Sequence, residues 1–348
     1  MQTQALDRTI KKASVVVLES STMTLVGSRF KENVGGNGVI SMFASNATVE
    51  RTTFEYNAAS VQQLAAIQDG GIGRRSLAET TPDQTLHEHS TTIALWFGSV
   101  ANLAYTSFVN NGGTSAGALF ATDGGTKLFL RSVEFLANQA VRSDFAAGAV
   151  AVTDGAVASI ADATFDGNHA QSQWSAGAIY VNLGSVVINT ASFVNNAAHA
   201  HPYAGTWAGS GVLYADESAV QIDNATIFDN EATGDTDLTA SNYADALYLV
   251  LPQEIIVRDS TFEPILDGGK TVAINPGSIA GVTQGGCIQH PCPKGSSCEY
   301  ANYSITCTPC QGMTYSSDVS YRTPPYGHLT SALRPLARVR TSCHARRA

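Results

Sequence analysis

Hydrophobic and polar positions alternate in short segments along most of the chain. In residues 177–193 (GAIYVNLGSVVINTASF) an apolar segment leads into a polar Asn-Leu-Gly turn, and a second segment follows from Ser185 to Asn189. Residues 211–227 (GVLYADESAVQIDNATI) repeat this layout. These segments have the length of strands, are rich in β-branched residues and are separated by turn residues. The pattern therefore predicts many short β-strands rather than helices.

Two sequence signatures recur. The first is Phe-x-x-Asn, and the second is a small residue followed by a short apolar run. Phe-x-x-Asn occurs at 30–33, 54–57, 108–111, 135–138, 165–168 and 193–196; Ile227–Asn230 fills the same position, and Phe262 opens a copy without the Asn. The second signature begins at Gly38, Gly117, Gly148, Gly177 and Gly211, with degenerate copies beginning at Ile93 and Asp245, where Gly is expected.

The two signatures alternate along the chain, and the two kinds of spacing between them vary to different extents. From the start of each apolar run to the next Phe position the step is 15 to 18 residues, whereas from each Phe position to the next run it is 8 to 39 residues. Stacked strands must stay in register, while loops at one edge tolerate insertions. The spacing therefore predicts a solenoid in which one part of every coil has a nearly constant length.

The repeated positions indicate the core. We expect Phe, Val and Ile to point inward and to stack on their counterparts about 4.8 Å away in neighbouring coils. The Asn three residues after each Phe is expected in a turn, where a left-handed conformation costs Asn little. Stacked Asn side chains can also hydrogen-bond along the axis as a ladder.

The Phe-x-x-Asn and Gly-Gly-Ala-(Ile/Leu/Val) pair resembles the repeats of the polymorphic outer membrane proteins of chlamydiae. It is also similar to repeats in large surface proteins of algae and other protists. The resemblance covers about residues 13–265, although most copies here carry a single Gly. It implies an all-β fold, a right-handed parallel β-helix of about seven or eight coils, of the kind shared with pectate lyases.

Composition and charge narrow the class of protein. Charged residues make up 14% of the chain and hydrophobic residues 44%, which allows a large core. The net charge is −9, yet residues 321–348 hold six Arg and no acid. The acidic body argues against nucleic acid as the main partner.

No run of about 18 apolar residues predicts a membrane span. The N-terminus lacks the apolar segment of a secretory signal. If the protein is extracellular, we therefore expect the chain to be a fragment.

All six cysteines follow residue 286, which divides the chain into parts. We expect a β-helix domain over 1–280 with an inserted loop at 58–91, a Cys-rich module at 287–320, and a basic, disordered tail at 321–348. The segment CTPCQGMTYSSD (307–318) resembles the ephrin-receptor-like Cys-rich repeats of extracellular proteins, and the cluster suggests disulfides in an oxidising compartment. The disulfide candidates are Cys287, Cys292, Cys298, Cys307 and Cys310. Cys343 is left over, and a zinc site at Cys307 and Cys310 is the less favoured alternative.

Several polar residues are candidates for chemistry. Asp123 and Asp154 lie six residues after a Gly, and Asp216 lies five after one. A stacked row of carboxylates would suit Ca²⁺ or an acid/base pair of a polysaccharide-acting enzyme, with Lys127, Arg131 and Arg142 as the cations nearby. The Thr-Asp-Gly context of Asp123 and Asp154 instead favours plain turns.

Other candidate residues have a simpler interpretation. The acidic group Asp229, Glu231, Asp235 and Asp237 fits a solvated loop better than a metal site. The pairs His87/His89 and His199/His201 lie in insertions, where surface histidines are common. Arg74–Arg75 is a possible proteolytic site. Asn46, Asn224 and Asn302 are glycosylation candidates, each followed by x-Ser/Thr.

The sequence contains no nucleophile elbow, Walker loop or His-Glu-x-x-His motif. We therefore expect a non-enzymatic, cell-surface or secreted protein with a structural or adhesive role, with protein or polysaccharide ligands and no cofactor. The alternative is a polysaccharide-binding or polysaccharide-modifying protein of lyase, hydrolase or epimerase type, in which Asp123, Asp154 and Asp216 act as catalytic residues or bind Ca²⁺. The fold alone hosts both roles.

Overall fold

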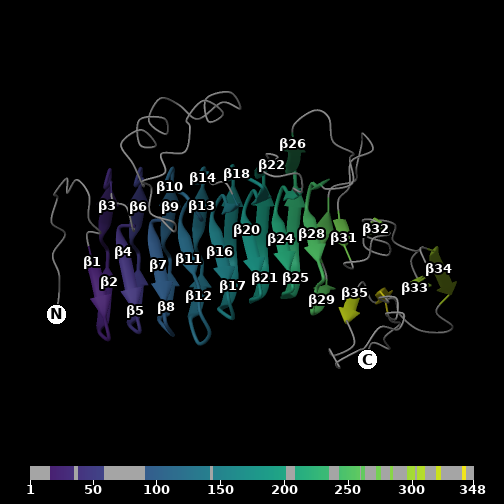
Figure 1. Ribbon diagram of the computed structural model, residues 1–348, viewed down its shortest axis with the longest axis horizontal. Helices are drawn as coiled ribbons and strands as arrows, with labels where there is room; N and C mark the ends of the chain where they lie inside the picture. The colour runs from purple at the N-terminus through teal and green to yellow at the C-terminus, as the bar shows by residue number, and fades with distance from the viewer. Residues whose placement is uncertain are drawn as a thin grey trace.

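The computed structural model describes most of residues 16–262 and shorter segments beyond. The described ranges are 16–34, 38–58, 91–141, 144–200, 208–234, 243–258, 260–262, 272–275, 283–284, 296–301, 304–309, 319–322 and 339–341. Every regular element in these ranges is a β-strand. Figure 1 shows the strands stacked side by side along the long axis of the molecule. The fold is a parallel β-solenoid, which confirms the predicted fold class.

One coil shows how the chain winds. β20 (Ile179–Asn182) is followed by β21 (Ser185–Val194), β22 (Ala197–Ala200) and β23 (Ala208–Ser210). β24 (Leu213–Asp216) then pairs in parallel with β20, with Ile179 opposite Leu213. Each coil thus contributes to up to four sheets, which we call sheets I to IV, with either one long strand or two short ones in sheet II.

Sheets I and II carry the nearly constant part of the coils. Sheet I consists of β1 (Val16–Glu19), β4 (Ile40–Phe43), β7 (Ile93–Trp96), β11 (Leu119–Ala121), β16 (Val150–Thr153), β20, β24, β28 (Leu247–Val250) and β31 (Val272–Asn275), all paired in parallel. Sheet II consists of β2 (Thr22–Val26), β3 (Arg29–Lys31), β5 (Asn46–Glu50), β6 (Thr53–Glu55), β8 (Val100–Ala104), β9 (Ser107–Val109), β12 (Lys127–Arg131), β13 (Glu134–Leu136), β17 (Val157–Asp166), β21, β25 (Ala219–Phe228), β29 (Glu254–Arg258) and β30 (Thr261–Phe262).

Sheets III and IV lie in the part of the coil that varies in length. Sheet III consists of β10 (Gly112–Gly113), β14 (Gln139–Val141), β18 (His169–Ser172), β22 and β26 (Glu231–Gly234), and sheet IV of β15 (Phe145–Ala147), β19 (Trp174–Ala176), β23 and β27 (Tyr243–Ala244). Ala140, Ala146 and Ala170 form a small apolar cluster between them. A Cβ added at Gly209 would lie 3.4 Å from the Cβ of Ala200, so only small residues fit here. The sequence predicted loops in this region and missed these two sheets.

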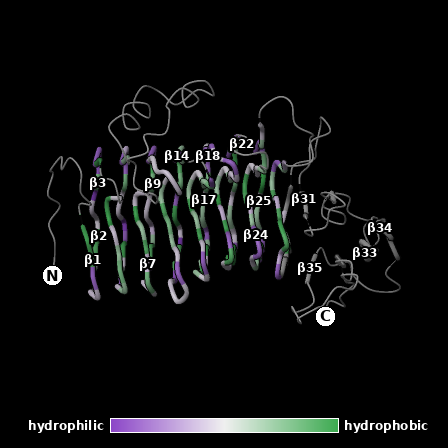
Figure 2. Tube along the Cα trace, in the orientation of Figure 1, coloured by the Kyte–Doolittle hydropathy of each residue, from purple (hydrophilic) through white to green (hydrophobic). Residues whose placement is uncertain are grey.

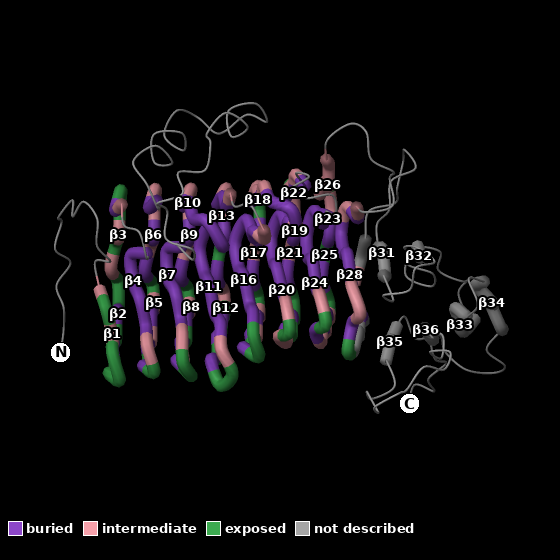
Figure 3. Tube along the Cα trace, viewed as in Figure 1, coloured by how far each residue is buried: buried purple, intermediate pink, exposed green. Residues whose placement is uncertain are grey.

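The predicted Phe positions form a stack through the core. The rings of neighbouring coils are nearly parallel, with centroids 4.7 to 5.2 Å apart from Phe30 to Phe193. All but Phe30 are fully buried, and Ile227 continues the column. Burying each ring contributes about 2–3 kcal/mol, and the stacked contact adds to this. Figure 2 shows the hydropathy along these strands, and Figure 3 shows buried residues in the successive coils from β4 to β28.

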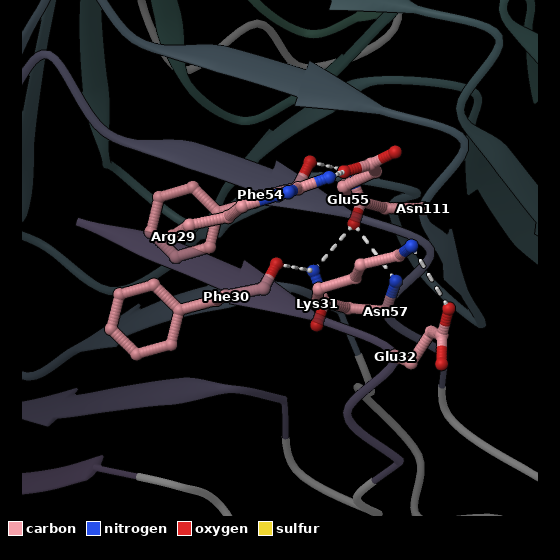
Figure 4. Close-up of polar contacts among 8 residues, drawn as sticks. All are labelled: Arg29, Phe30, Lys31, Glu32, Phe54, Glu55, Asn57 and Asn111. Atoms are coloured by element: carbon pink, nitrogen blue, oxygen red, sulfur yellow. Dashed lines mark hydrogen bonds and ion pairs between the residues drawn. The ribbon is translucent and has the colours of Figure 1, made fainter. Parts of the chain in front are cut away.

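The Asn residues of the repeat form the expected ladder (Figure 4). The Asn57 Oδ1 accepts from the amide nitrogen of Asn33 at 3.1 Å and from its Nδ2 at 2.8 Å. The Asn57 Nδ2 in turn donates to the Phe30 carbonyl and to the Asn111 Oδ1. The same bonds repeat as far as Asn230. A ladder of this kind satisfies buried amides that would otherwise cost about 1–3 kcal/mol each.

One detail of the expected turn was wrong. The left-handed residue is not the Asn of the motif but the residue before it, for example Glu32 (φ 56°), Tyr56 (φ 53°) and Asn110 (φ 51°). The Asn side chain must point into the stack to join the ladder. The preceding residue therefore makes the turn and faces away from the core.

The glycine of the second signature marks a place where coils approach closely. A Cβ at Gly117 would overlap the carbonyl oxygen of Gly148, and it would lie only 2.6 Å from the amide nitrogen of Gln139. The register also corrects one alignment. Ile93 pairs with Ile40 and Leu119, so Thr91, not Ile93, occupies the glycine position in that coil.

Strands from the C-terminal part pair in antiparallel fashion. β32 (Thr283–Gln284) pairs with β31, and β35 (Val319–Arg322) pairs with β29. β33 (Ser296–Ala301) and β34 (Ser304–Pro309) form a pair in which Cys298 lies opposite Cys307, and β36 (Val339–Thr341) pairs with β33 and β35. The number of coils, their handedness, the domain boundaries and the disulfides stay predictions.

Candidate functional site

Asp123 and Asp154 lie in the turn between sheets I and II. Both have left-handed backbones, with φ of 74° and 53°. The Asp123 Oδ2 accepts from the Phe97 amide nitrogen at 3.2 Å, and the Asp154 Oδ2 accepts from the Thr122 hydroxyl at 3.0 Å. Each carboxylate therefore holds the turn of the preceding coil. Figure 3 shows this edge of the solenoid as its most exposed region.

The same turn position carries unrelated side chains in other coils. Its occupants are Ser20, Ala44, Phe97, Asp123, Asp154, Leu183, Glu217 and Leu251, and all have a φ between 42° and 74°. The backbone shape recurs while the chemistry does not. Leu183 interrupts the expected row of carboxylates after Asp154, so the structure brings Asp123 and Asp154 into adjacent coils without Asp216.

Asp216 lies one position earlier, at the end of β24. It pairs with Asn182 in the preceding coil, and Asn182 pairs with Thr153. Asp216 is half-buried. Burial raises its pKa to about 6, and the nearby charge of Glu217 adds to this effect. The environment of Asp216 therefore favours its protonated form.

Asp216→Asn is expected to stabilise the protein above pH 6 but not near pH 4. The folded-state pKa of about 6 exceeds the ordinary value of 3.8, so the folded state binds more protons between these values. The free energy of unfolding of the wild type therefore falls as pH rises through this window. The shift alone corresponds to roughly 3 kcal/mol, and partial exposure reduces this to about 1 kcal/mol.

Urea unfolding at pH 4 and pH 8 measures this difference. Asn already occupies the equivalent position at residue 182, so the substitution fits the coil. The reciprocal variant, Asn182→Asp, should lose stability at pH 8 only. An equal gain from Asp216→Asn at both pH values would contradict the assigned cause.

A column of aromatic rings lines the outer side of sheet I. Tyr180, Tyr214 and Tyr248 stack with centroid distances of 5.3 and 5.5 Å, and Phe145 stacks on Tyr180 at 4.9 Å. Ala176 and Ala208 of sheet IV belong to the same buried cluster, and Trp174 packs against it. Burial raises the pKa of Tyr214 well above its usual value, so its hydroxyl stays protonated. This column was missed, although an aromatic residue follows the apolar start in the runs at 177, 211 and 245.

The outer side of sheet II forms a surface that we call the wall. It consists of the outward-facing residues of β2, β5, β8, β12, β17, β21 and β25, which are mainly Thr, Ser, Asn and Val. Within it, Phe129, Val157 and Val187 are 42%, 40% and 36% exposed. Val157 lies diagonally between the other two, because Phe129 and Val187 both pair with Ser159. These residues, together with the partly exposed Val100, form what we call the wall patch.

The cations predicted near the carboxylates and the predicted surface histidine His199 lie on different sheets. Lys127 and Arg131 are exposed on β12, on the wall. The His199 ring contacts the Thr233 hydroxyl at 3.1 Å in sheet III. Asp229 and Glu231 flank the start of β26, and burial raises the pKa of the neighbouring Asp245. Within the described ranges, no three His, Cys, Asp or Glu side chains are grouped so as to hold a metal ion.

The remaining predicted positions lie outside the described residues. They are residues 59–90 of the inserted loop with Arg74, Arg75, His87 and His89, as well as Arg142, His201, Asp235, Asp237, Cys287, Cys292, Cys310, Cys343 and Asn302. In the described part of the chain, none of the segments forms a helix with the length and apolarity that crossing a membrane requires.

The geometry defines the class of the molecule. The chain is a parallel β-solenoid protein with a stacked aromatic core, an Asn ladder and an exposed outer wall. Comparison with protein-family models, with curated proteins and with solved structures returns no match for it.

Proposed function

We propose that the chain is a non-catalytic, structural and adhesive solenoid of a secreted or cell-surface protein, whose wall binds a protein or polysaccharide ligand. The observation that carries this proposal is the wall patch, where Phe129, Val157 and Val187 are exposed on three successive paired strands of sheet II. Grouped exposed apolar residues with a polar rim are typical of interaction sites. The proposal retains the expected right-handed coils, the likeness to surface-protein repeats and the Cys-rich extracellular module.

The core supports a rigid presentation of this surface. Phe rings and Asn amides connect every coil from Phe30 to Asn230. A ligand then meets a preformed face, which lowers the entropy lost on binding. The two carboxylates in the turn between sheets I and II support a structural role rather than a catalytic one, because Asp123 and Asp154 accept hydrogen bonds that hold the turns.

A panel of immobilised polysaccharides and extracellular-matrix proteins, with and without Ca²⁺, tests the proposal on the full chain. We expect binding without product release, weakened at least about 10-fold by Phe129→Ser combined with Val187→Ser, since two exposed anchors are lost. Val26→Ser is the matched control, because Val26 is 54% exposed on the wall but lies in the first coil. Product formation that Asp154→Ala abolishes would replace the proposal with a catalytic one.

The second candidate is a polysaccharide-binding or polysaccharide-modifying protein. Asp216 favours it, because a carboxyl group with a pKa of about 6 suits general acid/base chemistry near neutral pH. Turnover of a uronic-acid polymer that Asp216→Asn abolishes would select this candidate.

A further inference from the structure

Two of the glycosylation candidates lie on the wall, near its two ends. The first is Asn46-Ala47-Thr48 in β5, and the second is Asn224-Ala225-Thr226 in β25. Successive side chains of a strand point to opposite faces. In both triplets the Asn is exposed and the middle Ala is only 2% exposed, so the Asn and the Thr face outward together.

Both amides lie on exposed side chains of the wall. Asn46 lies opposite Thr22 and Val100, in the outermost column of the wall. Asn224 has a left-handed backbone (φ 56°) within β25, and its side chain is exposed. Its Nδ2 makes one long, exposed hydrogen bond to the Thr190 hydroxyl at 3.3 Å, and substitution of that nitrogen removes little else.

We propose that Asn46 and Asn224 carry N-linked glycans. The inference rests on the exported location in the proposed function. The donor is an oligosaccharide joined to a lipid through a pyrophosphate. The Asn Nδ2 forms a bond to the anomeric carbon of the first sugar, the bond from that carbon to the pyrophosphate oxygen breaks with its electron pair going to the pyrophosphate, and the amide nitrogen loses one proton.

The positions of Asn46 and Asn224 determine where the two glycans would lie relative to the wall patch. Asn46 is opposite Val100, and Asn224 lies in the coil that follows Val187. The glycans therefore flank the wall patch and leave Phe129 and Val157 open between them. Asn102 is equally exposed on the same wall but is followed by Leu103 and Ala104, so it lacks the hydroxyl residue that transfer requires.

The test is to secrete the full chain from a eukaryotic host behind a supplied signal sequence. Peptide mass spectrometry after enzymatic deglycosylation in heavy-oxygen water then reads the occupancy of each Asn. We expect most copies to be modified at Asn46 and Asn224. We expect Asn46→Gln and Asn224→Gln each to remove one glycan, which is seen as a faster-migrating band on a gel. Ala104→Thr is the positive control, because it gives Asn102 the same outward-facing triplet.

Unmodified Asn46 and Asn224 would overturn the inference whether Asn102 is modified or not. If Asn102 alone is modified, the wall is accessible and the natural acceptors fail for local reasons. If no site is modified, the wall is closed to the transferase. Ligand binding is measured separately, so a glycosylated chain that binds nothing would refute the proposed function and leave this inference standing.

Discussion

Gly148→Ala is expected to cost at least about 4 kcal/mol in the free energy of unfolding, or to prevent folding altogether. A Cβ at this position would overlap the carbonyl oxygen of Gly177 and would lie 2.7 Å from the amide nitrogen of His169. Both obstacles are backbone atoms. Relief therefore requires moving two coils apart, which strains the hydrogen bonds of sheets I and III at the same point.

Chemical denaturation of Gly148→Ala beside Gly124→Ala measures this cost. Gly124 lies in the exposed turn between β11 and β12, and a Cβ there would meet nothing within 4 Å. Gly124→Ala should therefore change the free energy of unfolding by less than about 0.5 kcal/mol. Similar stabilities for the two variants would show that the glycine column is not a point of close approach.

The sequence predicts those features that recur in every coil. The Phe stack and the Asn ladder were expected because a parallel, in-register stack places identical positions above one another. Phe135 pairs with Phe165, and the Asn138 Nδ2 reaches the Asn168 Oδ1 at 3.0 Å. Each of these positions has the same environment in every coil, so the same residue type recurs at it. The recurrence can be recognised as a regular spacing in the sequence.

The sequence does not predict those features that depend on contacts between different segments of the coil. The strands of sheets III and IV are short and rich in Ala, Ser and Gly, and they carry no alternation of hydrophobic and polar residues that a pattern could detect. The register of β7 could not be read across the long insertion before it, which is why Ile93 was aligned with the glycine position. The tyrosine column depends on sheet IV packing against sheet I, and local sequence does not encode that contact.

For the candidate carboxylates, the sequence likewise predicts the position in the coil but not the contacts between different segments of the coil. The equal spacing of Asp123 and Asp154 from their glycines gives them the same turn position in adjacent coils. The one-residue offset of Asp216 was also visible, but its consequence was not. That offset places Asp216 over Asn182 and beside the tyrosines, where burial raises its pKa.

Removal of one complete coil is expected to leave a folded protein, whereas removal of half a coil is expected to destroy it. Deleting residues 148–176 joins Ala147 to Gly177, so Gly177 takes the place of Gly148. Phe135 would then stack on Phe193, and Asn138 would bond to Asn196, because the deletion removes Phe165 and Asn168, which lie between them in the present register. In a solenoid each coil contacts only its neighbours, so the loss is about one interface.

Deleting residues 148–161 removes fewer residues but leaves a coil without β16 and without the first part of β17. The strands on either side, β11 and β20, would then each lose one of their two partners in sheet I. Unpaired backbone groups and an open core should abolish cooperative unfolding.

Thermal unfolding followed by circular dichroism, with the maximum dimension measured by small-angle X-ray scattering, compares the two deletions directly. The stacked-coil account predicts that the variant lacking 148–176 melts cooperatively and is shorter by about 4.8 Å, while the variant lacking 148–161 shows no cooperative transition. Loss of folding in both variants, or equal stability of both, would contradict the claim that each coil is an exchangeable unit of one parallel stack.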